Sequence, residues 1–252
     1  MTMPALESGQ IVAENKGAVL EITFDRADKL NAFTSAMYRD LVKLLDHAEH
    51  SEALRVVFFR GEGRAFSAGN DLADFLNAKP GEAGEAAHFI KAIYRFPKAL
   101  VAAVQGNAVG VGTTMLLHTD LVVAADDAKF LTPFVDLGAV PEAGSAKLLP
   151  AWLGYQRAAR MLLLGEPMLA QEALEAGLVA KVVPTDQVQQ TASEWAQTLA
   201  KKPPRALRES KRLMRSGISR GLDDILNEDL ALFGEMLQSD EAKAVLTAMH
   251  KR

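Results

Sequence analysis

Three mostly apolar runs constrain the fold of this chain more than any other feature. They are LRVVFFRG (54–61), LVAAVQG (100–106) and LVVAAD (121–126). Apolar runs of this length that end at a turn residue are typical of strands buried on both faces. Because parallel strands need a crossover connection between them, we expect helices between these runs.

The segments before and between these apolar runs have the patterns of helices and of a further strand. We expect helices over 34–50, 84–96 and 113–120, and a strand over 18–24. Apolar residues of the first helix fall on one face, and Thr34 can cap its start. Strands that alternate with helices predict an α/β fold with a mostly parallel sheet and right-handed crossovers.

The chain becomes nearly all helical after about residue 144, apart from one short strand at 180–184. Segments 204–214 and 221–237 are amphipathic, and Ser239 can cap a last helix. An apolar helical tail after a complete α/β core can cover a neighbouring subunit or pack on its own, and both remain open. We expect a core domain over 1–195 and a helical oligomerisation region over 196–252.

Composition excludes several classes of protein. The net charge is −4 without a basic stripe, which argues against nucleic-acid binding. The chain contains no cysteine, so disulfides, thiol catalysis and cysteine-ligated zinc are excluded. The five histidines are scattered, and we expect no metal site. No apolar run is long enough to span a membrane and the N-terminus lacks a signal-peptide pattern, so we expect a cytoplasmic protein.

Two glycine-rich turns follow predicted strands. In GRAFSAGNDLADF (63–75), Gly69 can direct the N–H of Asn70 into a cleft, and QGNAVGVGTTMLL (105–117) opens a helix. Two free N–H groups at strand ends can bind one developing oxyanion. Each turn can equally be only a tight turn, and neither matches a nucleotide-binding fingerprint.

One carboxylate stands out in GAVPEAGSAKLL (138–149), where Glu142 lies among apolar residues. Burial would raise its pKa and make it a better general base, whereas a solvated loop charge is the alternative. Ala143 and Gly144 suggest a flexible backbone beside it. We expect His118 to be a satisfied core histidine, and His47 and His50 to share an exposed helix end.

Four motifs, in this order along the chain, resemble those of a known protein superfamily. AFSAGNDL, AVQGNAVGVG, FLTPFVDLGAVPEAGS and GLVAKVVP resemble the crotonase (enoyl-CoA hydratase/isomerase) superfamily, and most of all its peroxisomal-type delta-3,delta-2-enoyl-CoA isomerase branch. The resemblance implies a ClpP-like spiral of ββα units with a helical C-terminal trimerisation region. It also implies an acyl-CoA thioester of fatty acid metabolism as substrate, no separate cofactor, and a homotrimer or dimer of trimers.

The resemblance also implies roles for individual residues. The backbone N–H groups of Asn70 and Val111 would form the oxyanion hole. The residues that it places along the acyl-CoA are Ser67, Ala68, Gly69, Asp71, Leu72, Lys29, Gly110 and Phe134, with Asn31 near them. Asp71 is expected to brace its loop by hydrogen bonds. Lys211 and Arg212 either meet CoA phosphates or form a solvated helix face.

Departures from the hydratase pattern favour one reaction. Hydratases of this superfamily use two glutamates, at positions where this chain has Thr114 and Phe134. Glu142 stands instead where the isomerase branch has its single catalytic glutamate, so the resemblance implies double-bond migration. Hydration with Glu142 as the lone acid/base and a non-catalytic acyl-CoA-binding protein remain alternatives. A serine protease on the related fold would need a histidine partner for Ser67 or Ser145, and none is evident.

Overall fold

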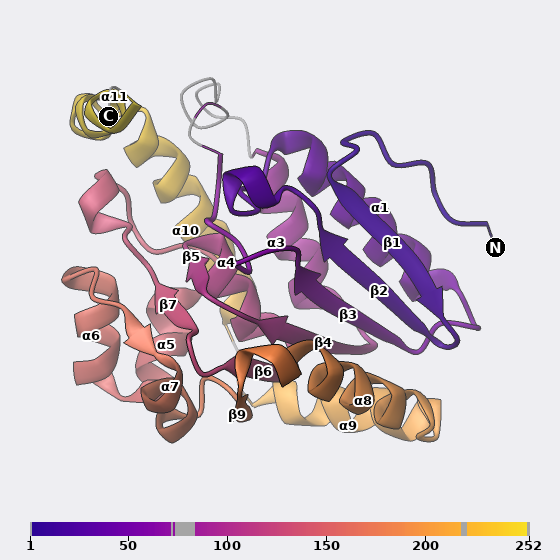
Figure 1. Cartoon of the computed structure of the whole chain (residues 1–252). Coiled ribbons are helices and arrows are strands. Elements are labelled where there is room, and N and C mark those ends of the chain that lie inside the picture. The colour runs from indigo at the N-terminus through magenta and orange to yellow at the C-terminus, as the bar shows by residue number, and fades with distance from the viewer. Residues whose placement is uncertain (1, 72, 74–83, 218–220, 251–252) are drawn as a thin grey trace.

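A computed structural model describes residues 2–71, 73, 84–217 and 221–250. Within these ranges the largest sheet has six strands (Figure 1). In spatial order they are β1 (Ile11–Lys16), β2 (Val19–Phe24), β3 (Val56–Gly61), β4 (Ala99–Val104), β6 (Leu121–Ala125) and β9 (Lys181–Val183). Only β1 and β2 pair antiparallel among these neighbours. The predicted, mostly parallel sheet is confirmed.

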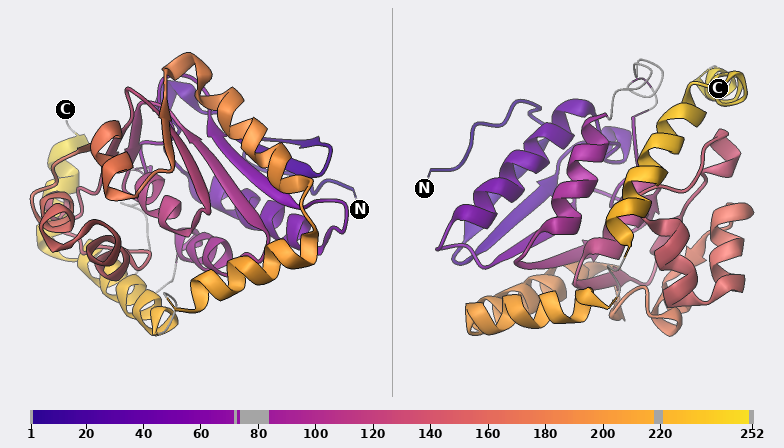
Figure 2. Two further views of the ribbon diagram at one scale, coloured as in Figure 1. Left: turned by 90° about the horizontal axis from the view of Figure 1, so that it is seen from below. Right: turned by 180° about the vertical axis from the view of Figure 1, so that it is seen from behind.

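Helices cover both faces of this sheet, as Figure 2 shows. Helices α1 (Ser35–His50) and α3 (Glu85–Arg95) lie on one face, and α8 (Val188–Ala200) lies on the other. Alternate residues of β3 enter different cores: Val57 and Phe59 pack on the α1 side, while Val56 and Phe58 pack on the α8 side. Burial on both faces explains why the strand is an unbroken apolar run.

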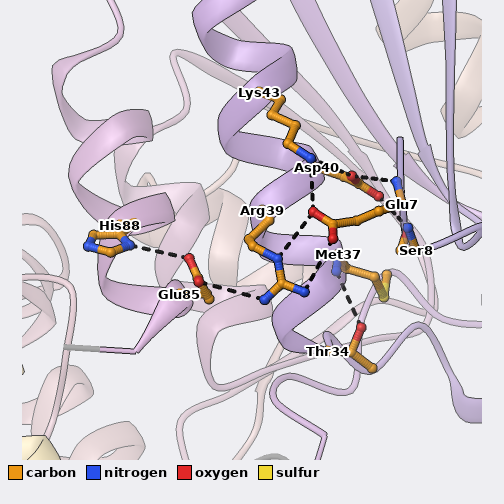
Figure 3. A network of polar contacts seen from close by, with 9 residues as sticks. All are labelled: Glu7, Ser8, Thr34, Met37, Arg39, Asp40, Lys43, Glu85 and His88. Atoms are coloured by element: carbon orange, nitrogen blue, oxygen red, sulfur yellow. Dashed lines mark hydrogen bonds and ion pairs between the residues drawn. The ribbon is translucent and has the colours of Figure 1, made fainter. Parts of the chain in front are cut away.

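A polar network holds the N-terminal segment against α1 and α3 (Figure 3). The carboxylate of Asp40 is fully buried and accepts hydrogen bonds from the N–H groups of Glu7 and Ser8, each at 2.9 Å. Arg39 pairs with Glu7 on this segment and with Glu85 on α3. The two helices and the segment before β1 are therefore joined on one side of the sheet.

Short elements near the ends of the strands form a second unit. Strands β5 (Asn107–Val109), β7 (Lys129–Leu131) and β8 (Met168–Leu169) make a three-stranded sheet among the described residues. The helix expected over 113–120 is divided into α4 (Val111–Thr114) and the 3-10 helix η2 (Met115–His118). Strands of two or three residues are too short to give an alternating pattern, and the sequence did not predict them.

The C-terminal part is helical, as expected. Its helices are α5 (Ser145–Leu153), α6 (Tyr155–Leu163), α7 (Ala170–Ala176), α9 (Pro204–Ser216), α10 (Leu222–Leu237) and α11 (Asp240–His250), with the 3-10 helix η3 (Val135–Leu137) before α5. Helix α9 contacts β4, and α11 contacts η3 of the same chain. The boundary expected after residue 195 falls inside α8, and the division stays a prediction. In the part of the chain described, no helix has the length and apolarity to cross a membrane.

Two expectations about basic residues are wrong. Lys211 does not lie on a solvated helix face, because it is only 8% exposed. Its ammonium donates hydrogen bonds to the carbonyl oxygen of Lys98 at 2.6 Å and to Asp120 at 2.7 Å. Arg212 is exposed and pairs with Glu209, as a solvated face requires. His47 is buried, and only its neighbour His50 is exposed.

Candidate active site

Glu142 lies in the loop between η3 and α5, and it is buried. Its residue surface is only 3% exposed, so a solvated loop charge is excluded. Burial raises the pKa of its carboxyl, a hydrogen bond from Thr114 lowers it, and the negative charge of Asp229 raises it, so that the pKa is about 7. A carboxyl group with a pKa near neutrality can both accept and return a proton at physiological pH.

The backbone after Glu142 is held by hydrogen bonds. Ala143 and Gly144 both have left-handed conformations, with φ of 55° and 70°. Nε2 of His118 lies 2.9 Å from the carbonyl oxygen of Ala143, and the N–H of Gly144 donates to Asp229 at 3.0 Å. Both residues that suggested a flexible backbone therefore make hydrogen bonds, and their flexibility stays a prediction.

His118 is a satisfied core histidine, as predicted. It is 2% exposed, and burial lowers its pKa to about 4, so its ring is neutral near pH 7. Because the partner of Nε2 is a carbonyl oxygen, the neutral ring carries its proton on Nε2 and donates it to Ala143. Its hydrogen bond fixes the loop and leaves no role for this histidine as a base.

The two glycine turns lie side by side in the structure. Ser67 and Ala108 form a parallel bridge, and the N–H of Val109 donates to the carbonyl oxygen of Ser67 at 2.9 Å. Gly69 has φ of 87°, and a Cβ atom there would lie 2.7 Å from the carbonyl oxygen of Val109. Only glycine allows this conformation and this close approach between the two backbones.

Two backbone N–H groups at these turns are available. Phe33 pairs with the turn through Gly69 and Asp71, which directs the N–H of Asn70 away from this bridge. Val111 is the first residue of α4, so its N–H has no acceptor inside that helix. Among the described residues neither of the two N–H groups has a hydrogen-bond acceptor. Both can therefore donate to a ligand.

Helix α4 connects the second turn with the carboxylate. Val111 begins this helix, and Thr114 ends it one turn later. The hydroxyl group of Thr114 donates to Oε1 of Glu142 in a short hydrogen bond between two buried side chains. One four-residue helix thus carries both an available N–H and the partner of the carboxylate.

Other predicted site residues mostly support the first turn. Ser67 is fully buried, and its hydroxyl donates to the carbonyl oxygen of Asn31 and accepts from the N–H of Gly69. The carboxylate of Asp71 accepts a hydrogen bond from the N–H of Ala73 at 2.9 Å, which is the expected bond to the backbone of its loop, and it also pairs with Arg26 at 2.7 Å. The remaining predicted residues are distributed as follows: Lys29 is exposed, Ala68 and Gly110 are half-buried, and Leu72 lies outside the described residues.

Phe134 forms part of an apolar wall. It is 3% exposed, and its ring meets that of Phe233 on α10 edge-on, with centroids 6.2 Å apart. No carboxylate therefore occupies this position, and a phenyl ring contributes to a dry environment instead. Asp136, two residues later, is exposed at the surface.

Sequence reasoning missed three polar partners. Thr114 was notable only as the position of a missing glutamate, although its hydroxyl donates to Glu142. Tyr38 donates to the side chain of Asn70. Asp229 accepts from the N–H of Gly144, which lies 85 residues earlier in the chain. The three-residue spacing of Val111 and Thr114 was the only local signal. In the described ranges no group of three or more His, Asp or Glu side chains is placed to hold a metal ion.

Comparisons with known proteins identify the family of the chain. The family model described as Enoyl-CoA hydratase/isomerase matches residues 14–252. Enoyl-CoA delta isomerase 2 of Rattus norvegicus is 37% identical over 94% of this chain, which spans only 62% of that relative's length. Enoyl-CoA delta isomerase 3, peroxisomal, of Mus musculus is 34% identical over 98% of this chain and 80% of its own.

Relatives with hydratase names are also similar. A 2,3-dehydroadipyl-CoA hydratase of Escherichia coli (strain K12) is 31% identical over 95% of this chain and 94% of its own. Among solved structures, Pseudomonas aeruginosa OdaA superposes with a TM-score of 0.93 at 38% identity, over 97% of this chain and all of that one. The fold is that of crotonases, and the chain belongs to the enoyl-CoA hydratase/isomerase family.

Proposed function

We propose that this protein is a delta-3,delta-2-enoyl-CoA isomerase that uses Glu142 as its only acid/base group. The observation that carries the proposal is the buried carboxyl group with its pKa near 7, which accepts a hydrogen bond from Thr114, together with the buried phenyl ring of Phe134. A threonine and a phenylalanine stand where the superfamily resemblance places the two glutamates of hydratases. One proton-transfer group suffices for double-bond migration, whereas hydratases divide the work between two.

The proposed reaction moves one proton. The carboxylate of Glu142 takes a proton from C2 of a 3-enoyl thioester, and the electron pair of the C–H bond forms a dienolate. The negative charge that develops on the thioester oxygen is held by the N–H groups of Asn70 and Val111. Glu142, now protonated, returns the proton to C4, which gives the conjugated 2-enoyl thioester and regenerates the carboxylate.

The apolar surroundings support both steps. A buried carboxylate is a stronger base than a solvated one, because burial destabilises its charged form. The same burial excludes water, which would otherwise compete with C4 for the proton or add to the product. Since the hydroxyl of Thr114 is neutral, it can hold one carboxylate oxygen without acting as a second acid.

A direct assay tests the proposal. Purified protein is incubated with 3-hexenoyl-CoA, and the conjugated 2-enoyl thioester is followed by its absorbance. Glu142→Gln keeps an acceptor for Thr114 and should reduce kcat by about 10² to 10⁴. Asp136→Asn removes an exposed carboxylate six residues earlier and serves as the matched control.

Two outcomes would contradict the proposal. They are no turnover by the wild type, and turnover by Glu142→Gln within tenfold of the wild type. A parallel assay with crotonyl-CoA separates the alternatives, since hydration that depends on Glu142 would assign the protein to the hydratases. Binding of the CoA ester without either reaction would identify a non-catalytic acyl-CoA-binding protein.

Assembly into a homotrimer or a dimer of trimers belongs to the same proposal. Four large apolar side chains on or next to α6 and β8 are between 53% and 68% exposed: Tyr155, Leu163, Leu164 and Leu169. Large apolar side chains that are exposed in this way can belong to an interaction surface. Light scattering coupled to size-exclusion chromatography should give a multiple of three chains, and a monomer at micromolar concentration would contradict this part.

A further inference from the structure

Asp229 reaches the Glu142 loop from a distant part of the chain. It lies in the middle of α10, and its Oδ2 accepts a hydrogen bond from the N–H of Gly144 at 3.0 Å. The same helix packs on this glycine, since a Cβ atom at Gly144 would lie 2.7 Å from Leu222 and 3.5 Å from Leu226. Helix α10 therefore covers the loop with apolar side chains and fixes it with one carboxylate.

The loop needs such an anchor because its backbone is unfavourable. Ala143 has φ of 55°, and a left-handed conformation costs a residue with a side chain roughly 1–2 kcal/mol. Conformations of this kind persist only when the surrounding structure holds them. The hydrogen bonds from His118 and to Asp229 hold the two residues that immediately follow Glu142.

We propose that Asp229 is a positioning residue that holds Glu142 in place for proton transfer by anchoring the N–H of Gly144. The inference rests on the proposed function and extends it, because it assigns a part in the proton transfer to the C-terminal helix α10. Asp229 does not touch the reacting atoms in this role. It fixes the backbone from which the carboxylate of Glu142 projects.

The charge of Asp229 gives a second effect that can be measured. Its negative charge raises the pKa of Glu142, after the larger effect of burial. Burial raises the pKa of Asp229 itself, the hydrogen bond from Gly144 lowers it, and the charge of Glu228 raises it, so that the pKa is about 6. Asp229 is therefore charged near pH 8. The other polar neighbours do not supply a negative charge that could replace that of Asp229. Thr114 lowers the pKa of Glu142, and His118 is neutral. The ammonium of Lys147 on α5 is positive and lies near Gly221.

Two substitutions separate the hydrogen bond from the charge. Asp229→Asn keeps an oxygen acceptor for Gly144 and removes the charge, so we expect kcat within a few-fold of the wild type and a pH profile moved to lower pH. Asp229→Leu removes both, and we expect kcat to fall on the order of tenfold to a hundredfold, since a small misplacement of a reacting group has effects of this size. Glu228→Gln removes the adjacent carboxylate on α10 and should leave kcat unchanged.

A titration that does not depend on turnover completes the test. The protein is labelled with ¹³C at Cδ of glutamate, and Glu142→Gln identifies the resonance of Glu142. We expect its pKa to be lower in Asp229→Asn than in the wild type by more than the titration error. Thermal unfolding of each variant shows whether Asp229→Leu still folds, and the Asp229→Asn comparison stands if it does not.

The outcomes distinguish this inference from the proposed function. Full activity in a folded Asp229→Leu variant would overturn the positioning role, and an unchanged pKa of Glu142 in Asp229→Asn would overturn the charge coupling. If the wild type does not isomerise 3-hexenoyl-CoA but the pKa falls in Asp229→Asn, the proposed function fails while the coupling between Asp229 and Glu142 stands.

Discussion

The hydroxyl group of Thr114 donates a hydrogen bond to the carboxylate of Glu142, and both side chains are buried. The bond stabilises the charged form of the carboxylate and therefore lowers a pKa that burial raises. A neutral donor thus tunes the proposed base at a position where the superfamily resemblance implies a second glutamate in hydratases.

Removing this donor should change the pH dependence of the reaction. In Thr114→Val the shape of the side chain is kept, but the hydrogen bond is lost. We expect the acid limb of the kcat/KM profile to move to higher pH by about one unit, which corresponds to a bond to a charged group worth about 1.5 kcal/mol. Thr114→Ser retains the hydroxyl and should restore the wild-type profile. Identical profiles for all three proteins would show that the bond does not affect the base.

Glu142 should also affect the stability of the fold in a pH-dependent manner. Folding raises its pKa from 4.5 to about 7, so the protonated form is favoured in the folded protein. Its favourable contribution is complete below about pH 4.5 and is lost as the pH rises through about 7. At about 1.4 kcal/mol per pKa unit, the loss is on the order of 3 kcal/mol.

Urea unfolding of Glu142→Gln at several pH values measures this effect. Glutamine resembles the protonated acid, so we expect the variant to be more stable than the wild type above pH 7. The difference should shrink as the pH is lowered from about 7 to 4.5. A difference that stays constant across this range would mean that Glu142 is charged, and solvated, in the folded protein.

The close approach of the two glycine turns predicts an effect of a single methyl group. In Gly69→Ala the new Cβ would lie 2.7 Å from the carbonyl oxygen of Val109, at a residue with φ of 87°. The turns must separate, which misplaces the N–H of Asn70, and losing one such donor costs about 10² to 10³ in kcat. Gly217→Ala, where no atom lies within 4 Å of the new Cβ, is the control. A Gly69→Ala enzyme with normal kcat would remove this N–H from the mechanism.

The buried ammonium of Lys211 predicts a loss of stability without a loss of substrate affinity. Lys211→Met leaves the carbonyl oxygen of Lys98 without this donor and removes one ion pair of Asp120, which keeps its pair with Arg215. We expect the free energy of unfolding to fall by about 1–3 kcal/mol, with the KM for the CoA ester unchanged. Arg212→Ala, at an exposed neighbour, should change the stability by less than about 0.5 kcal/mol. A raised KM in Lys211→Met, with stability intact, would instead support a contact with CoA phosphates.

Local patterns in the sequence were sufficient to predict the central strands, the helix capped by Thr34, and both glycine turns. β4 is buried at every position, so its apolar run carried a strong signal, and the side chain of Thr34 accepts from the N–H of Met37 as expected. Glu142 was notable as a lone carboxylate in an apolar loop, but its catalytic role was implied only by the superfamily resemblance. Each of these features depends on residues that are close in the chain.

The features that were missed depend on distant contacts. Asp229 is one of several acidic residues in an amphipathic helix, and only the packing of α10 selects it as the partner of Gly144. The sequence pattern around Lys211 is that of a solvated helix face, and only the folded chain brings Asp120 and Lys98 beside it. His47 likewise sits in a helix end whose burial depends on what packs against it.

The packing of α10 on Gly144 also sets an order of assembly. A ribosome makes the two glycine turns and the Glu142 loop long before it makes Asp229, Leu222 and Leu226. The turns can close as soon as their strands pair, but the left-handed backbone at Ala143 and Gly144 gains its contacts with α10 only near the end of synthesis. The two turns of the proposed oxyanion hole can thus form early in the nascent chain, while the anchor of the proposed proton-transfer group arrives last.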